Sequence, residues 1–154
     1  MNIAIRPLKV EDALVSWRWR NDREVFEPTI GGFFGDITPE KELQWIITVL
    51  ARPDERRFAI EVDGKYVGNI YLTEITPEQA LTGLFIGNKE YWNKGVGSAA
   101  LSLLVDYAFG VLKCKSVYCY IKKQNIASIK THQRIGYRIV SEEKGILTLV
   151  LNNT

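Results

Sequence analysis

The chain has 154 residues, of which 46% are hydrophobic and 25% are charged, and its formal net charge is +2. This composition predicts one globular domain over residues 1–154 and excludes a disordered chain. The balance of basic and acidic residues argues against a nucleic-acid partner. No apolar run approaches the ~18 residues of a membrane span, and residues 1–5 show no signal-peptide pattern, so we expect a cytoplasmic protein without a membrane partner.

Residues 2–6 alternate between apolar and polar positions and predict a first strand, which Pro7 ends. A helix follows from Glu11 and closes with the segment Trp17–Asp22. A second helix starts at Thr38, a typical N-cap residue before Pro39, and ends before Pro53. Its predicted buried stripe is Leu43, Ile46, Ile47 and Leu50.

The segment Trp17–Asp22 holds two tryptophans and two arginines in four positions, and these cannot all face a core. In one interpretation Trp17 packs inward, while Trp19 and the arginines cover the surface with their stems. In the other, this helix end is one wall of a substrate pocket and its arginines are available for phosphate or carboxylate.

Residues 27–37 contain three glycines and one proline and predict a loop. Two aromatic residues, Phe33 and Phe34, are unusual in a bare loop. They indicate either a lid or docking surface, or side chains that pack down onto the domain.

The rest of the chain alternates strands with two further helices. Turn residues lie between stretches in which apolar and polar residues alternate. They predict one β-hairpin from 58–62 and 66–75 and another from 137–140 and 146–151. Asn125 is the expected cap of the last helix, and Gly136 its stop. The expected strands are 58–62, 66–75, 81–87, 116–121, 137–140 and 146–151, and the expected helices are 96–112 and 126–134.

Two glycines, Gly95 and Gly97, lie where the strand 81–87 gives way to the helix that starts at residue 96. The first turn of a helix has N–H groups without an intrahelical partner, and its dipole favours negative charge. Without a Cβ, the glycines let a phosphate approach the backbone, and Lys94 adds a positive side chain. The junction therefore predicts an anion-binding site.

Other interpretations of this loop are weaker. A Walker loop needs the lysine after the glycine and is rejected. The letters of a Rossmann fingerprint are present from Gly95 to Ala100, but roughly 60 residues remain and position 115 is a lysine instead of an acid. A plain glycine turn before a core helix stays as the structural alternative.

The segment Lys94–Ser98 resembles the acetyl-CoA pyrophosphate loop of the GNAT N-acetyltransferases. A second segment, Asn125–Tyr137, resembles the N-x-A-(A/S)-I-x-x-Y-x-K-x-G-F motif of the same family. The resemblance covers nearly the whole chain. It implies an α/β (α+β) single-domain GNAT fold, with a mixed, mostly antiparallel sheet of about seven strands flanked by about four helices.

The resemblance also implies acetyl-CoA as co-substrate and no metal. The single histidine and the spacing of Cys114 and Cys119 independently argue against a metal cluster, and we expect both cysteines as buried thiols. Trp92 departs from the family, which usually has Arg or Gln there. The residues implied to bind the cofactor are Phe85, Ile86, Gly87, Trp92, Asn93, Lys94, Gly95, Val96, Gly97, Ser98 and Asn125.

Acetyl transfer to an amine needs a route for the amine proton and a donor for the leaving thiolate. We expect Glu74 as the base, because it ends a strand in an apolar stretch that could raise its pKa. His132 replaces the tyrosine that protonates the thiolate in many members and is expected to be the acid. Tyr118 and Tyr120 are alternatives, expected on opposite faces of the sheet. Each assignment has a structural alternative without a catalytic role. Glu74 would then be a solvated acid at the end of a strand, and His132 a helix residue hydrogen-bonded to the backbone.

The expected partner is a small-molecule amine, and a homodimer is left open. The early segment also resembles the branch of ribosomal-protein N-terminal acetyltransferases and nucleotide-sugar N-acetyltransferases. We prefer a nucleotide-linked amino sugar as acceptor, because its base could stack on the aromatic residues of this segment and its diphosphate could pair with Arg18 or Arg20. A protein N-terminus and other small amines are alternatives, with polycationic antibiotics third. A non-catalytic acyl-CoA-binding module is the alternative of another class. The residues expected to bind the acceptor are Trp17, Arg18, Arg20, Asn21 and Phe33.

Overall fold

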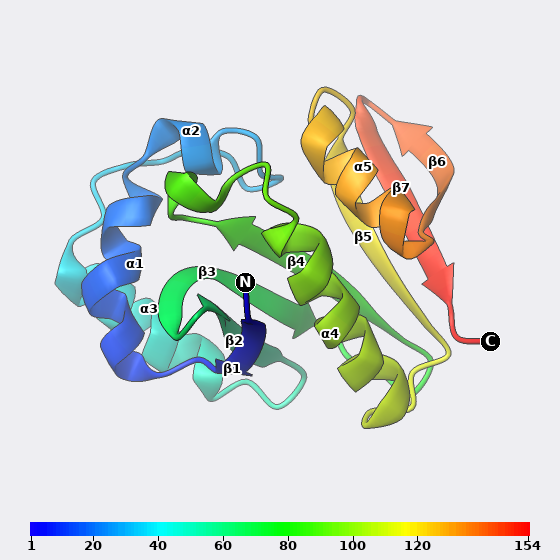
Figure 1. Cartoon of the computed structure of the whole chain (residues 1–154), viewed down its shortest axis with the longest axis horizontal. Helices are drawn as coiled ribbons and strands as arrows, with labels where there is room; N and C mark the ends of the chain where they lie inside the picture. Colours follow the sequence, from blue (N-terminus) through cyan, green and yellow to red (C-terminus); the bar gives the residue numbers. More distant parts are fainter.

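In the computed structural model, which describes all 154 residues, one seven-stranded sheet separates two groups of helices (Figure 1). The strand order is β1-β2-β3-β4-β5-β7-β6, and only β4 and β5 are parallel. The strands are β1 (Ile3–Pro7), β2 (Arg56–Val62), β3 (Lys65–Thr73), β4 (Gln79–Ile86), β5 (Ser116–Lys122), β6 (Arg138–Glu143) and β7 (Ile146–Asn152). The helices are α1 (Ala13–Arg20), α2 (Arg23–Phe26), α3 (Pro39–Leu50), α4 (Val96–Gly110) and α5 (Ile126–Ile135), with 3₁₀ turns at Val10–Asp12 and Lys89–Tyr91.

This architecture confirms the predicted fold class, with five helices in place of about four. The additional helix, α2, is a single turn whose cap Asp22 accepts a hydrogen bond from Glu24 N. Pro7 does not end the first strand as expected, because it still pairs with Phe58. An edge strand such as β1 tolerates a proline, since the missing N–H faces away from the ladder. None of the helices has the length and apolarity needed to cross a bilayer.

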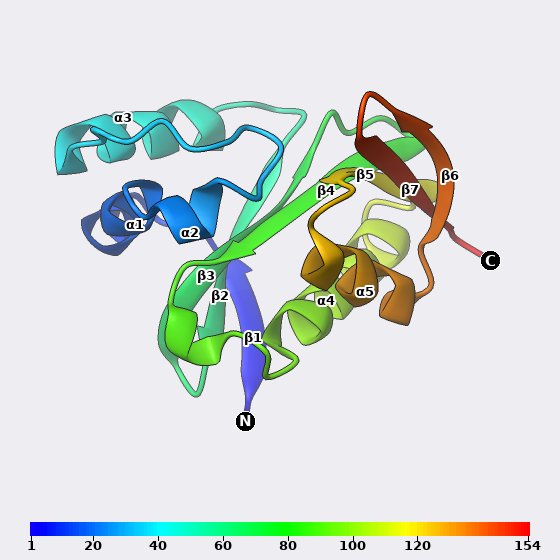
Figure 2. The same cartoon turned by 90° about the horizontal axis from the view of Figure 1, so that it is seen from above.

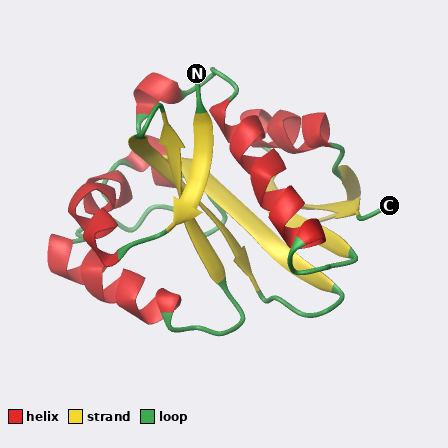
Figure 3. Cartoon of the chain, turned by 60° about the horizontal axis from the view of Figure 1, so that its bottom comes forward, coloured by secondary structure: helices red, strands yellow, loops and turns green.

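The two helix groups cover opposite faces of the sheet (Figures 2 and 3). Helices α4 and α5 lie on one face, where α4 buries six side chains in the largest apolar cluster together with β3, β5 and β7. Helices α1, α2 and α3 lie on the other face, over the first half of the sheet. A smaller cluster of Leu8, Ala13, Ile46 and Ala59 anchors them there.

The predicted buried stripe of α3 is correct at Ile46 and wrong at its other three positions. Leu43, Ile47 and Leu50 are each about 40% exposed, whereas Glu42, Ile46 and Val49 are buried. Glu42 can occupy a core position because Ser16 Oγ donates to it at 2.6 Å and Arg20 pairs with it at 3.2 Å. Buried charges occur only when they are paired. Because the charged Glu42 lies on the buried face, the apolar residues of the sequence do not mark that face correctly.

Strands β4 and β5 separate soon after they meet. They pair only at Gln79–Ser116, Ala80–Val117 and Leu81–Tyr118. Beyond these pairs β4 stays with β3 up to Ile86, and β5 stays with β7 up to Lys122. The sheet therefore opens between the C-terminal halves of two adjacent strands.

Candidate active site between β4 and β5

A cavity of about 290 Å³ lies where β4 and β5 separate. Its lining combines the free edges of the two strands with the loop after α2 and one side of α5. The lining side chains include no carboxylate, and Lys122 is the only one that carries a permanent charge. The residues are Phe26, Pro28, Thr29, Ile30, Gly31, Gly32, Tyr71, Thr73, Leu81, Thr82, Gly83, Leu84, Cys119, Tyr120, Ile121, Lys122, Asn125, Ser128 and His132.

The glycine loop ends in a helix terminus with unused donors. Gly95 caps α4 in the left-handed region, with φ of 80°, and supplies no capping side chain. The first protein bond in this turn is Ala99 N to Gly95 O, so the N–H groups of Val96, Gly97 and Ser98 have no acceptor within the protein. Such a terminus is a site for an anion.

Two cations lie near this terminus. Lys94 is exposed, with Nζ 5.7 Å from the Tyr91 ring centroid. Arg134 reaches across from α5 and donates from Nη1 to Ser98 Oγ at 3.0 Å. Sequence reasoning missed Arg134, although it stands at the lysine position of the second motif.

The end of β4 is occupied by internal contacts. Trp92 Nε1 donates to Ile86 O at 2.8 Å. Phe85 is buried with Val25 and Phe26, against the rings of Trp19 and Trp92. The strand edge that lines the cavity is therefore Leu81–Leu84 and not the expected Phe85–Ile86.

Packing against Trp19 accounts for the glycine at position 87. A Cβ at this position would collide with the Trp19 indole. Trp19 also packs against the rings of Tyr66, at 4.8 Å between centroids, and of Phe85, at 6.1 Å. The interpretation that Trp17 packs inward while Trp19 covers the surface is thus reversed, because Trp19 is the residue that faces the sheet.

His132 lies at the inner end of the cavity and is 3% exposed. Its Nδ1 lies 2.8 Å from Ser128 O, and its Nε2 has no hydrogen-bond partner. Burial lowers the pKa of the imidazole below its ordinary value of 6.5, and the bond to Ser128 opposes this in part. His132, the residue expected to be the acid, therefore lines the cavity, and it also makes the backbone bond of the structural alternative.

Tyr137 and Thr82 form a buried polar pair beside His132. Tyr137 Oη and Thr82 Oγ1 are 3.0 Å apart, and Thr82 Oγ1 also lies 3.3 Å from Tyr118 O. The Tyr137 ring packs edge-on against the imidazole, with 4.9 Å between centroids. Burial raises the pKa of Tyr137 above its ordinary value. Sequence reasoning singled out neither residue, although Tyr137 ends the second motif.

Asn125 and Lys122 hold the loop after α2 over the cavity. Asn125 Oδ1 caps α5 by accepting from Ser128 N at 3.3 Å, and its Nδ2 donates to Pro28 O at 3.4 Å. Lys122 Nζ donates to Glu27 O at 2.9 Å. Asn125 therefore lines the cavity as expected, with its amide engaged by the protein.

Glu74 lies outside the cavity lining. It follows the last residue of β3 with a left-handed φ of 49°, and its side chain is exposed. The apolar environment expected for a base is absent there. Its charge adds to desolvation in raising the pKa of the neighbouring Tyr118.

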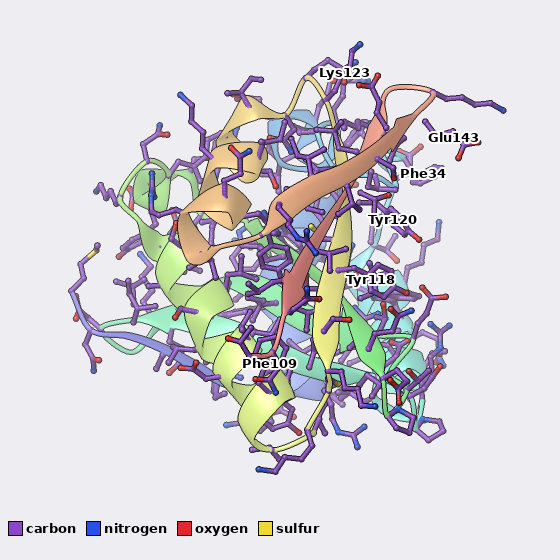
Figure 4. All side chains as sticks on the ribbon, turned by 90° about the vertical axis from the view of Figure 1, so that its right-hand side faces the viewer. Phe34, Phe109, Tyr118, Tyr120, Lys123 and Glu143 are labelled. Carbon is purple, nitrogen blue, oxygen red and sulfur yellow. The ribbon has the colours of Figure 1, made fainter.

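Tyr118 and Tyr120 lie on the same face of β5, with 5.8 Å between ring centroids. The expectation of opposite faces is wrong, because alternate residues of a strand share a face. Both point away from α4 and α5, on the side where Phe34 also lies (Figure 4). Tyr120 lines the cavity and is 43% exposed.

The expected acceptor residues do not meet at this cavity. Trp17, Asn21 and Phe33 line a separate, more open hollow with residues 34–39. Asn21 clamps that loop, because its side chain accepts from Ile37 N at 2.9 Å and donates to Ile37 O at 2.7 Å. Phe33 also packs against the aromatic cluster under β4.

The two arginines of this segment differ in their environment. Arg20 pairs with the buried Glu42 and stacks on Phe26 at 4.8 Å and on Phe85 at 5.5 Å. It therefore holds α1 to α3. Arg18 is exposed, with its guanidinium 5.5 Å from the Trp17 ring centroid.

Known proteins resemble this chain in sequence and in fold. A family model described as an acetyltransferase (GNAT) domain matches residues 2–138. Acetyltransferase PseH of Campylobacter jejuni is 25% identical over 149 residues, which are 96% of this chain and 90% of that protein. Spermidine N(1)-acetyltransferase of Escherichia coli is 33% identical over 89 residues, 57% of this chain; the match covers 48% of the relative, about half its length. Spermidine N-acetyltransferase of Vibrio cholerae, solved with CoA and spermine, shares the fold with a TM-score of 0.85 at 16% identity, covering 97% of this chain and 95% of that one.

The family match includes the early helices, the glycine loop and α5, so it spans both motifs and the separated strands. The resemblance inferred from the residues is confirmed: the chain belongs to the GNAT acetyltransferase family.

Proposed function

We propose that this protein is an acetyl-CoA-dependent N-acetyltransferase whose acceptor is the primary amine of a nucleotide-linked amino sugar. The observation that carries the proposal is the cavity between β4 and β5. The buried imidazole of His132 lines this cavity. Gly97, in the helix turn with three free N–H groups, lies next to the lining residue Leu84. An acyl carrier with an anionic end and a reactive thioester end needs these two features.

The donor half of the site fits coenzyme A. The N–H groups of Val96, Gly97 and Ser98 would bind the pyrophosphate, with Arg134 and Lys94 as counter-charges. The unpaired edge of β4 at Thr82–Leu84 would pair with the amides of the pantetheine arm as an added strand does.

The site favours direct attack by the amine over an acyl-enzyme. Cys119 is the only nucleophilic thiol in the lining, and it is 2% exposed. Burial raises its pKa to about 12, so the reactive thiolate is absent near neutral pH. The chain would bind the two substrates side by side and assist the proton transfers.

The charge of the lining distinguishes between acceptors. A polyamine carries several positive charges and needs carboxylates, yet the lining has none and contributes Lys122 instead. A nucleotide diphosphate is anionic and suits that lysine. Tyr120, which is 43% exposed, offers an aromatic face for a ring. Arg20, expected for this role, is paired with Glu42, so Lys122 replaces it in the proposal.

The proposal is tested by following thiol release from acetyl-CoA with a panel of acceptors. The panel is a UDP- or dTDP-linked 4-amino sugar, the same sugar without the nucleotide, spermidine and short peptides. We expect the highest kcat/KM for the nucleotide-linked sugar. Turnover of peptides or spermidine with none on the amino sugars would overturn the acceptor, and equal kcat/KM for the free and linked sugars would remove the role of the nucleotide.

Calorimetry with CoA separates this enzyme from a non-catalytic binding module. Binding of CoA without thiol release from acetyl-CoA, in the presence of any of the amines, would favour the module. Failure to bind CoA at all would overturn the donor half of the proposal.

A further inference from the structure

The imidazole of His132 is fixed in one orientation by α5. Ser128 O, one helical turn earlier, can only accept a hydrogen bond, so the bond of 2.8 Å requires a proton on Nδ1. In the neutral ring the other nitrogen, Nε2, then has a lone pair and no proton. This Nε2 is the one buried side-chain polar atom of the chain without a partner, and His132 lines the cavity.

A neutral His132 of this tautomer cannot begin by protonating a thiolate, because its only ring N–H proton lies on Nδ1, in the hydrogen bond to Ser128 O. This conflicts with the expectation that His132 acts simply as the acid. An unprotonated Nε2 is suited to accept a proton first. The carbonyl of Ser128 would then stabilise the imidazolium through the Nδ1–H bond.

Resting on the proposed function, we propose that His132 is a proton relay between the two substrates. As the neutral amine attacks the thioester carbonyl, Nε2 takes the proton that the amine nitrogen loses. The C–S bond then breaks with its electron pair on sulfur, and Nε2 returns the proton to that sulfur. The products are the amide and the free thiol, and the imidazole is again neutral with its proton on Nδ1.

The surroundings favour the neutral resting form. The titratable groups near the ring are Tyr137, just before β6, whose ring lies edge-on, and Cys119 and Lys122 from β5 in the same lining. Arg134 on α5 is directed to Ser98, and no carboxylate lines the cavity. Nothing in the lining offers a negative charge that would hold a proton on Nε2.

The tautomer can be measured directly, because the chain has a single histidine. In protein labelled with ¹⁵N-histidine, the two ring nitrogens give signals that need no further assignment. We expect a protonated Nδ1 and an unprotonated Nε2 at about pH 7.5, and a shift of the Nε2 signal when CoA thiol is added. A proton on Nε2, or a doubly protonated ring at this pH, would overturn the relay even if acetyl transfer is intact.

The pH profile supplies a second test. A relay is active with a neutral ring, so kcat should fall as the pH drops through the His132 pKa, below 6.5. A direct acid would show the reverse, with kcat falling as the pH rises through that value. His132→Gln should lower kcat by about 10²–10⁴-fold and remove this limb.

The exposed neighbour Gln133 gives the control, since Gln133→Ala should keep the parent profile. A His132→Gln enzyme with kcat within about threefold of the parent would overturn the relay. If the parent itself releases no thiol with any amine, the proposed function fails instead, and the labelled ring still reports its tautomer.

Discussion

Arg134 Nη1 donates to Ser98 Oγ at 3.0 Å, which places a cation of α5 beside the first turn of α4. A helix N-terminus carries partial positive charge, so a cation there is unfavourable without an anion between them. The three free N–H groups of the same turn also favour an anion at this position. The pyrophosphate of coenzyme A would satisfy both.

Arg134→Gln is therefore expected to weaken the donor and leave the chemistry unchanged. The KM for acetyl-CoA should rise about three- to tenfold with little change in kcat, because a charge-assisted bond at a partly exposed site contributes about 1 kcal/mol. Steady-state kinetics at two salt concentrations measure this, with a smaller effect at high salt. The control is Arg138→Gln, an exposed arginine on β6; an equal rise in that variant would contradict the assignment.

Gly97→Glu tests the anion site from the opposite direction. A Cβ at Gly97 would meet Leu84 and Thr131 only at 3.5 and 3.7 Å, and an acid suits the first turn of a helix, so the variant should fold. Its carboxylate would oppose the pyrophosphate, and CoA affinity should fall about 30- to 100-fold. Calorimetry measures this against Ser102→Glu, which adds the same charge on an exposed position of α4. Unchanged affinity in folded Gly97→Glu protein would remove the pyrophosphate from this loop.

Local signals explain why most of the fold could be predicted. Thr38 and Asn125 cap the helices expected there, and Gly95 and Gly136 adopt the left-handed conformations expected at helix boundaries. The glycine loop and the position of His132 follow from the same short-range patterns. The separation of β4 from β5 follows from pairing between distant segments, which a single sequence does not show.

The residues expected to bind the acceptor show more clearly what a single sequence cannot predict. Arg20 looked available because its partner, Glu42, lies 22 residues away on another helix. Trp17 and Trp19 exchange their expected places, because the space that receives Trp19 is made by Gly87, far along the chain just after β4. The shared face of Tyr118 and Tyr120, in contrast, follows from the sequence alone, because alternate residues of a strand lie on one face.

Gly87→Ala is expected to destabilise the protein although the backbone there is not in the left-handed region. The added methyl would collide with Trp19, whose ring is fixed between Tyr66 and Phe85, and overpacking of this kind costs roughly 1–3 kcal/mol. Urea unfolding measures the loss. At Gly31 a Cβ meets nothing within 4 Å, so Gly31→Ala should change stability by less than about 0.5 kcal/mol. Equal stability of the two variants would show that Trp19 can move aside.

Burial of His132 predicts a contribution to acid sensitivity. Its folded pKa lies below the ordinary 6.5, so between the two values the unfolded chain binds the proton and the folded chain does not. The stability from this group is complete above about pH 6.5 and is lost as the pH falls. The parent should therefore lose more unfolding free energy from about pH 7.5 to pH 5 than His132→Phe, in urea titrations at both pH values. An equal or smaller loss in the parent would mean that the folded pKa is not lowered.

Lys122→Glu should change which acceptors the cavity takes. Lys122 is the one permanent charge of the lining, and its Nζ is held by Glu27 O at 2.9 Å. Reversing that charge should lower kcat/KM for the nucleotide-linked sugar by about 10- to 100-fold, since like charges oppose each other, and should raise the relative turnover of spermidine.

Lys123→Glu provides the matched control for this change. Lys123 is the next residue, is exposed near Glu142 at 3.5 Å and lies outside the lining at the end of β5 (Figure 4). The Lys123→Glu variant has the same net charge as Lys122→Glu, so any general effect of net charge on the rate of substrate association appears in both variants. A difference between the two therefore reports contact inside the cavity. Equal ratios of sugar to spermidine turnover in both variants would show that Lys122 does not select the acceptor.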